Sequence, residues 1–358
     1  MIIKSNEMDL DEVLNLVKDY LKISKDLSML LEGKGSFINC YNPKTHRIHG
    51  KVDTLGAVTQ RCTHNSPNIT QAPKSKEFRE LLTVPDNKVL IDVDAGALEL
   101  VTLGHYLGQF DNYEFAKIVD SGDKSKGTDI HTINQKRVGL ATRDLAKTFI
   151  YSVVYGAGNT KIGDSLWTKG QEISYTQDEY NEAKEAVEKR VVYLDGKKFF
   201  PIAKGTLTPY TEELIFKTIF GTQVSIAFRD NTKGYRELCD WAINSVKNNY
   251  IKALDGRNLY LRSAHKALNL YLQSAGAIYM KYLLCHIDNQ LRAKYTHGKE
   301  FGYVANIHDA INLECDPEVA DDICKVLSQS FIDTSYKLGF KYPVYGEPKI
   351  GKNQYETH

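Results

Sequence analysis

The most constraining feature of the sequence is a set of residues spaced by four. Arg143, Lys147, Tyr151 and Tyr155 recur at this interval. Residues four apart share one face of an α-helix, so the spacing predicts a helix with two cations and two aromatic rings along one side. At the rise of an α-helix, Arg143 and Tyr151 lie roughly 12 Å apart, about the length of one nucleoside triphosphate. Taken alone, the pattern more often belongs to an amphipathic helix with solvated cations and buried tyrosines.

An acidic pair follows a predicted strand. Residues 89–91 form an apolar run that leads into Asp92 and Asp94, and a helical pattern begins near Leu98. A carboxylate at a strand-to-helix junction is well placed to hold a metal ion. A lone acid at this place more commonly caps the following helix, and both explanations remain open on this segment alone.

A second acid lies at the tip of a predicted hairpin. Two alternating apolar runs, residues 303–307 and 310–314, meet at His308 and Asp309. This pattern is typical of two strands joined by a tight turn. Asp309 is therefore either a simple turn residue or a carboxylate presented at the end of two strands.

The remaining elements follow from periodicity and turn residues. The Asp255-Gly256 pair within residues 254–262 predicts another hairpin, and His265, Asn269 and Gln273 share one face of a predicted helix. Residues 164–235 are the least informative part of the chain. The other predicted elements are a helix over residues 9–31, short strands over 35–56, a polar loop over 58–73, helices over 175–189, 234–250, 264–284 and 316–338, and a strand near 342–345.

Composition excludes several classes of protein. The 358 residues suit one large or two ordinary domains. Lys plus Arg number 46 against 45 Asp plus Glu, so any nucleic-acid surface must be local. The six cysteines form no CxxC pair, which argues against a zinc site and fits reduced thiols. With no signal peptide or bilayer-spanning run visible, we expect a soluble protein of the cytoplasm, that of the host if the protein is viral, with no membrane partner.

Together these segments resemble the DNA polymerase I family, family A, and most closely its replicative bacteriophage branch. The matches cover nearly the whole chain except residues 164–235, and five or six motifs in family order make coincidence remote. This resemblance favours the functional explanation of each motif over the structural one. The matching segments are Thr59-Gln60-Arg61 with Pro67-Asn68, Asp94 to Leu100 as motif A, Asp129 to Thr132, Arg143 to Gly156 as motif B, Arg262 to Ala277, and Ile307-His308-Asp309 as motif C.

The resemblance implies an α+β fold: the antiparallel-sheet palm and helical fingers of a right-hand polymerase, with thumb and exonuclease domains largely absent. It predicts a remnant thumb helix over residues 1–34, palm over 35–122 and 251–358, and fingers over 123–250. Because one apolar helix precedes the loop of Arg61, we expect the C-terminal part of a split or truncated enzyme. A second polypeptide would then supply the thumb and exonuclease.

By resemblance, two Mg²⁺ ions are the expected cofactors, and dNTPs and primer–template DNA the expected substrate and partner. The metal ligands would be Asp94, Asp309 and the backbone carbonyl of Ala95. His131, Arg143 and Lys147 would hold the triphosphate, with Lys147 also acting on the departing pyrophosphate.

Further roles follow from the same motifs. Tyr151 would stack near the sugar and base, and Glu99 would be the steric gate that excludes a ribose 2′-hydroxyl. Arg61 and Gln273 would donate to minor-groove acceptors, which correct base pairs present in similar places. The other expected DNA contacts are Tyr155 near the template base, His308 at the primer terminus, Arg257 and His265.

Some positions depart from the family pattern. Ala310 stands where motif C usually has Glu, Val101 where Arg often follows the gate acid, and Gln60 where Gly usually precedes the loop Arg. Ala310 leaves a second function open, a catalytically weak or inactive nucleic-acid-binding subunit. A single-subunit RNA polymerase is a further alternative, opposed by Glu99, since that class needs room for the 2′-hydroxyl.

Overall fold

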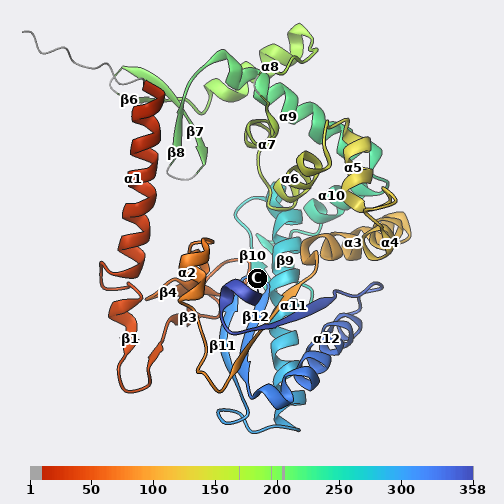
Figure 1. Cartoon of the computed structure of the whole chain (residues 1–358). Helices are drawn as coiled ribbons and strands as arrows, with labels where there is room; N and C mark the ends of the chain where they lie inside the picture. The colour runs from red at the N-terminus through yellow and green to blue at the C-terminus, as the bar shows by residue number, and fades with distance from the viewer. Residues whose placement is uncertain (1–9, 169, 195, 204–205, 358) are drawn as a thin grey trace, which may run out of the picture. The chain divides into compact units, whose positions relative to one another are not determined.

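The computed structural model describes residues 10–168, 170–194, 196–203 and 206–357 (Figure 1). Within these residues the fold is α+β, with small antiparallel sheets among many helices. None of the helices described has the length and apolar character needed to cross a membrane. The chain divides into two compact units. The first contains residues up to Asp94, Ile287–Ser328 and those from Gly346 onward; the second contains Ala95–His286 and Gln329–Tyr345.

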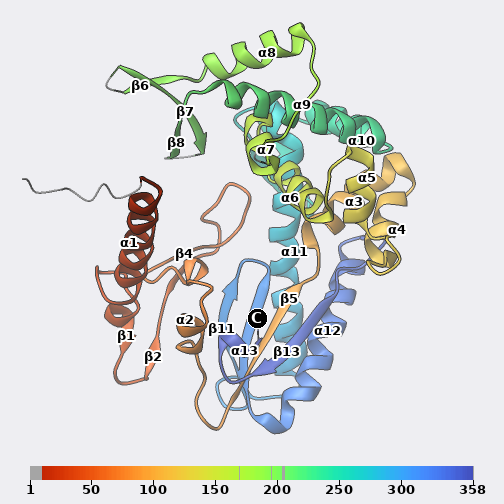
Figure 2. The same cartoon turned by 45° about the horizontal axis from the view of Figure 1, so that its top comes forward.

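A four-stranded sheet is the largest sheet of the first unit (Figure 2). Its strands follow the order β11, β12, β5, β13, and the pairs β11–β12 and β12–β5 are antiparallel. Ile91 pairs with Leu313 and Val93 with Ile311, and all four side chains are fully buried. This burial fixes the register, because a shift by one residue would move them to the other face. The strands are β5 (Val89–Ala95), β11 (Phe301–Ile307), β12 (Ala310–Cys315) and β13 (Gly346–Gly351).

The N-terminal part of the first unit confirms most of the predicted elements. The predicted helix over residues 9–31 is α1, although Asp9 lies outside the described residues. The short strands predicted over 35–56 form one hairpin and one strand of a second, whose other strand, residues 63–65, lies in the segment predicted as a loop. Arg47 in the first hairpin makes an ion pair of 2.6 Å with Glu314 of β12. The elements are α1 (Leu10–Leu30), η1 (Ile38–Cys40), β1 (Tyr41–Asn42), β2 (Arg47–Ile48), β3 (Lys51–Asp53), β4 (Thr63–Asn65), η2 (Ile69–Gln71) and α2 (Lys76–Glu80).

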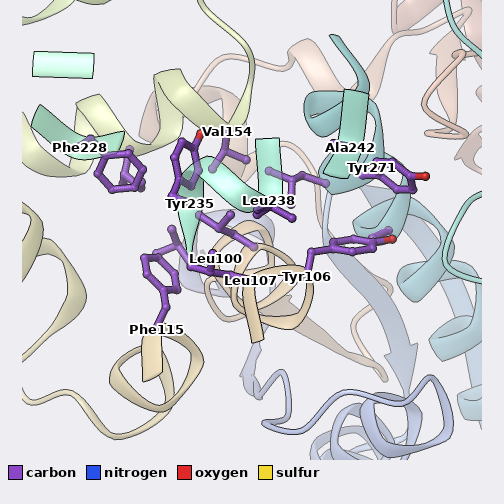
Figure 3. Close-up of a cluster of buried hydrophobic side chains, with 14 of the residues drawn as sticks. Leu100, Tyr106, Leu107, Phe115, Val154, Phe228, Tyr235, Leu238, Ala242 and Tyr271 are labelled. Carbon is purple, nitrogen blue, oxygen red and sulfur yellow. The ribbon is translucent and has the colours of Figure 1, made fainter. Parts of the chain in front are cut away.

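Helices make up most of the second unit, and many of them pack around a large apolar core (Figure 3). Leu100, Leu107, Phe115 and Phe228 point into it, each at most 2% exposed. The elements are α3 (Leu98–Asp111), α4 (Glu114–Ser121), α5 (Ile130–Val138), α6 (Arg143–Val154), α7 (Asn159–Leu166), α8 (Gln177–Glu188), β6 (Val192–Leu194), β7 (Lys197–Ala203), β8 (Thr206–Pro209), α9 (Glu212–Asn231), α10 (Tyr235–Asn244), β9 (Tyr250–Lys252), β10 (Asn258–Tyr260) and η3 (Ala264–Lys266).

Two long helices and two short elements complete the list of helices and strands. Helices α11 (Ala267–Arg292) and α12 (Ala320–Lys337) each have residues in both units. The short elements η4 (Pro317–Val319) and α13 (Gln354–Thr357) belong to the first unit. The hairpin predicted at Asp255-Gly256 is confirmed, because β9 and β10 pair on either side of it.

Three predicted boundaries are wrong. The helix predicted over 264–284 begins only at Ala267, after the 3-10 helix η3, and continues to Arg292. The helix predicted over 234–250 ends at Asn244, because Lys247 and Tyr250 exchange backbone hydrogen bonds and form a turn there. Asn248 and Asn249 in this turn have positive φ, which a helix does not allow. The strand predicted near 342–345 is not a strand, and β13 begins at Gly346 instead.

Candidate active site

The first unit brings the two predicted metal-ligating acids together. Asp94 lies near the end of β5, and Ala310 at the start of β12 is paired with it. Asp309 directly precedes Ala310, so the acids occupy the same end of neighbouring strands. Such strands lie about 4.8 Å apart.

The structure distinguishes Asp94 from Asp92 and decides the capping question. Asp92 is 4% exposed and is paired with Asn312 inside the sheet, whereas Asp94 is exposed. Neither acid caps α3, whose N-cap is Ala97 in the left-handed region with φ 50°. Asp94 is thus the acid that solvent and ligands can reach.

Basic side chains gather around Asp309 within the same unit. Arg61 Nη2 lies 3.8 Å from Asp309 Oδ2. Partial burial lowers the pKa of His64, and the charge of His308 lowers it further, which indicates that the two imidazoles are near neighbours. His64 was not predicted as a site residue; its only signal was its place in the polar loop near Arg61.

The acids form a suitable, incomplete set of magnesium ligands. Among the described residues no group of three or more His, Cys, Asp or Glu side chains could hold a metal ion. Two carboxylates without Cys or His ligands fit a hard cation such as Mg²⁺, which completes its shell with waters, carbonyls and substrate phosphates. Zinc, by contrast, prefers three or four protein ligands including nitrogen or sulfur.

In the second unit, the predicted cationic helix is α6. Thr142 caps its N-terminus by accepting a hydrogen bond from the Leu145 backbone N–H at 3.2 Å. One face is buried through Ala146, Phe149, Ile150 and Val154. Lys147 is exposed, and no hydrogen bond or ion pair occupies its ammonium among the residues that the structure describes.

Helix α5 contributes His131 beside α6. The His131 ring centroid lies 6.2 Å from that of Tyr151. His131 is 9% exposed. Burial lowers its pKa, and the charge of Arg143 lowers it further, so the imidazole is neutral at physiological pH. Helices α5 and α6 thereby bring three predicted nucleotide-binding residues into one cluster.

The C-terminal end of α6 lies close to α11. The helix ends at Val154, and Tyr155 is its C-cap. Asn269 on α11 donates to the Val154 carbonyl oxygen at 2.6 Å, and Gly156 has φ 71°. A Cβ at position 156 would lie 3.0 Å from Asn269 Cγ, so this glycine permits the close approach of the two segments.

Tyr155 contacts Glu99, the predicted steric gate. The Tyr155 hydroxyl donates a hydrogen bond to Glu99 Oε1. Glu99 lies in the first turn of α3 and is 8% exposed. The sequence placed the two residues in different motifs and did not predict their contact.

The other predicted DNA-binding residues remain spread over the second unit. Arg257 pairs with Asp255 at 2.6 Å in the β9–β10 turn. His265 lies in η3, and Gln273 is partly buried on α11.

These observations agree with comparison to known proteins. The chain matches DNA polymerase family A over residues 3–356, and it belongs to that family. It is 31% identical to the DNA-directed DNA polymerase of Enterobacteria phage T3, over 99% of this chain and 47% of that protein. It is 30% identical to the DNA-directed DNA polymerase of Escherichia phage T7, over 98% of this chain and 47% of that protein. A DNA polymerase I of Pseudomonas aeruginosa is 20% identical over 88% of this chain and 31% of its own length.

The matches cover nearly all of this chain but less than half of each phage polymerase. This chain spans about half the length of the curated phage relatives that it matches. The family membership therefore concerns the matched half of those proteins.

Proposed function

We propose that the chain is a template-directed DNA polymerase that transfers nucleotides from dNTPs to a primer 3′-hydroxyl. One observation carries this proposal: the register of β12 on β5, which places Asp94 and Asp309 at the same strand ends. Two acids far apart in the sequence, one exposed and the other partly buried, have no simple folding reason to meet at one end of a sheet. Membership of family A, with phage relatives named as DNA polymerases, supports it.

Asp94, Asp309 and the Ala95 carbonyl would hold Mg²⁺ in this proposal. The bound ions would lower the pKa of the primer hydroxyl and neutralise charge on the leaving pyrophosphate. Without them, the two carboxylates would repel the phosphates of the substrate. The acids therefore serve the reaction only together with a divalent cation.

The α5–α6 cluster would bind the nucleotide. Arg143 and Lys147 supply positive charge for the triphosphate, and neutral His131 supplies a hydrogen-bonding group without further charge. Tyr151, whose ring lies beside His131, would stack on the sugar and base. Glu99 would crowd a 2′-hydroxyl and so favour deoxynucleotides.

In this proposal the two units correspond to the palm and the fingers of a polymerase, and both contact DNA. The four-stranded sheet of the first unit fits a palm, and the helices of the second unit around α6 fit fingers. Primer–template DNA would contact residues on both units, namely Arg61, Tyr155, Arg257, His265, Gln273 and His308.

Helix α1 has exposed apolar side chains that a partner could cover. Helix α1 exposes Leu16, Tyr20 and Leu21 by 55%, 70% and 60%. The phage relatives contain about twice the matched length. We propose that a thumb and exonuclease segment, supplied by a second polypeptide, covers α1. Chromatography and pull-down from the native source test this: a monomer that extends primers processively without a partner contradicts it.

Magnesium-dependent primer extension tests the main proposal. Asp94→Asn and Asp309→Asn are each expected to lower the rate at least about a hundredfold, since a metal ligand contributes several kcal/mol to the transition state. Asp86→Asn is the matched control, because Asp86 is an exposed acid in the turn before β5. Extension that survives in both ligand variants would refute the assigned metal site.

Ala310 supports a second candidate function. It is paired with Asp94, at the place where the family pattern usually has Glu. A weak or inactive nucleic-acid-binding subunit would retain DNA binding while failing to extend primers in the same assay. Comparison of dNTP with rNTP incorporation separates the proposal from an RNA polymerase.

A further inference from the structure

One carboxylate joins the two helices of the proposed nucleotide site. Asp129 is the N-cap of α5, and its Oδ1 accepts the His131 backbone N–H at 3.1 Å. The same oxygen accepts Arg143 Nε at 3.0 Å and Nη2 at 2.8 Å. Its Oδ2 accepts the Thr132 hydroxyl at 2.5 Å. Asp129 is 8% exposed, so this arrangement is largely shielded from water.

The contact occupies only one edge of the Arg143 guanidinium. Arginine has five N–H donors in a planar fork, and the pair Nε and Nη2 forms its side edge. Arg143 makes no other hydrogen bond or ion pair to the described residues. The end edge, formed by Nη1 and the second hydrogen of Nη2, remains available. This edge has the geometry that binds two phosphate oxygens at once.

We propose that Asp129 is a positioning residue for the triphosphate: it anchors the side edge of Arg143 and directs the end edge of the guanidinium toward the phosphates. The proposal rests on the proposed polymerase function. An arginine side chain otherwise loses considerable rotamer freedom when it binds a ligand. An anchor within the protein removes that cost before the nucleotide arrives.

Asp129 also orders the second phosphate contact. Its bond to the His131 N–H fixes the first turn of α5, from which the His131 side chain projects. The His131 ring is buried, and its Nδ1 has no hydrogen-bond partner among the described residues. An unsatisfied buried imidazole nitrogen is costly unless a ligand or water completes it.

An acid near a triphosphate could instead weaken binding by repulsion. The four hydrogen bonds that Asp129 accepts argue against this, because they compensate its charge locally. Burial alone would raise its pKa, but hydrogen bonds from Arg143 and Thr132 lower the pKa to about 2. The carboxylate therefore stays ionised and keeps Arg143 in place at every pH where the enzyme would work.

Asp129→Ser tests the proposal, because serine keeps a good N-cap oxygen but is too short to hold the guanidinium edge. We expect KM for a dNTP to rise about tenfold, with kcat changed less than about threefold. The Kd for the same dNTP on a dideoxy-terminated primer–template should rise equally, as a readout without turnover. Asp144→Asn is the control, an exposed acid adjacent to Arg143 that forms no hydrogen bond with it.

A double-mutant cycle separates positioning from a general structural effect. In the Arg143→Ala background, Asp129→Ser should leave KM unchanged within about twofold, because the two changes remove one interaction. Additive effects would overturn the proposal, as would a KM that stays constant or falls in Asp129→Ser. If thermal melting shows Asp129→Ser unfolded, Asp129→Asn, which retains the cap, replaces it in the same cycle.

The outcomes also separate this proposal from the polymerase assignment. A wild-type chain that extends no primer with Mg²⁺, alone or with its native partner, overturns the proposed function and this inference with it. A wild-type chain that extends primers while Asp129→Ser behaves normally overturns only the role of Asp129.

Discussion

The contact between Tyr155 and Glu99 couples two residues with different proposed roles. Glu99 is buried in the first turn of α3, and the Tyr155 hydroxyl donates a hydrogen bond to its carboxylate. A hydrogen bond to a charged group is stronger than a neutral one and restricts the rotamers of both partners. The tyrosine thereby holds the carboxylate of the proposed steric gate in one orientation.

Tyr155→Phe removes this restraint while it keeps the ring. We expect the preference for dNTP over rNTP, measured as a ratio of kcat/KM values, to fall about threefold to tenfold. Glu99→Ala removes the gate itself and should lower the ratio further. Tyr193→Phe, at an exposed tyrosine on β6, is the control. An unchanged ratio in Tyr155→Phe would show that the hydroxyl does not orient the gate.

The sequence predicted which residue types share a face, but not their partners. A step of four placed Arg143, Lys147 and Tyr151 along α6 because helical geometry is local. The contact of Asp129 with Arg143 joins two helices, and its geometry depends on how α5 packs on α6. Such contacts are set by tertiary packing, which no local pattern encodes.

At the scale of elements, two hairpins were predicted correctly, and each has a turn residue with positive φ. Gly256 has φ 83° between β9 and β10, and His308 has φ 56° between β11 and β12. The Asp255-Gly256 pair predicts the first turn directly. The second was visible only through the alternation of the flanking strands, since histidine is a much weaker signal of positive φ than glycine.

Strands without alternation were missed. β13 contains two glycines and a proline, Gly346-Glu347-Pro348-Lys349-Ile350-Gly351, and depends on pairing with β5. Strand β7 has Pro201 in its interior and two adjacent phenylalanines, of which Phe200 is buried and Phe199 only partly. Proline and glycine argue against a strand locally, so only the neighbouring strands establish these two.

Helices α7 and α9 approach each other unusually closely, through glycine. A Cβ on Gly163 would lie 1.7 Å from the Lys217 carbonyl oxygen, and one on Gly221 would lie 2.0 Å from the Asn159 carbonyl oxygen. Both obstacles are backbone atoms, which cannot move without shifting a helix. The buried hydrogen bond of 3.0 Å between Thr160 and Thr218 depends on the same approach.

Gly163→Ala should therefore destabilise the protein by about 3 kcal/mol, at the upper end of overpacking effects, although alanine normally favours a helix. Urea unfolding of the purified variant measures this. Gly302→Ala is the control, because its Cβ would meet no atom closer than 3.7 Å. A Gly163→Ala variant as stable as wild type would mean that α7 and α9 can separate at little cost.

At the scale of the whole chain, the first unit is assembled from three separate segments. Strand β5 comes from the first segment, β11 and β12 from the second, and β13 from the third. The proposed metal ligands Asp94 and Asp309 consequently meet only when this non-local sheet forms. Formation of the sheet thus also brings the proposed metal ligands together.

Three buried or partly buried histidines make the stability of the chain depend on pH. His64 and His131 lie in the two site clusters, and His105 stacks on Phe340 with 4.4 Å between ring centroids. In each case burial is the main cause of a lowered pKa. The unfolded chain therefore takes up protons below about pH 6.5 that the folded chain does not bind.

Because the unfolded state binds more protons, the free energy of unfolding should fall as the pH falls from about 6.5 toward the lowered pKa values. Each histidine contributes at most about 1.4 kcal/mol per pH unit. Asp129, with a pKa of about 2, adds stability that is lost only below about pH 4, outside this window. Urea unfolding between pH 8 and pH 5 measures the slope. His105→Phe keeps an aromatic ring stacked on Phe340 and should reduce the slope of unfolding free energy against pH by the contribution of one histidine. A slope that is absent in wild type, or unchanged in this variant, would show that buried histidines do not cause the pH dependence.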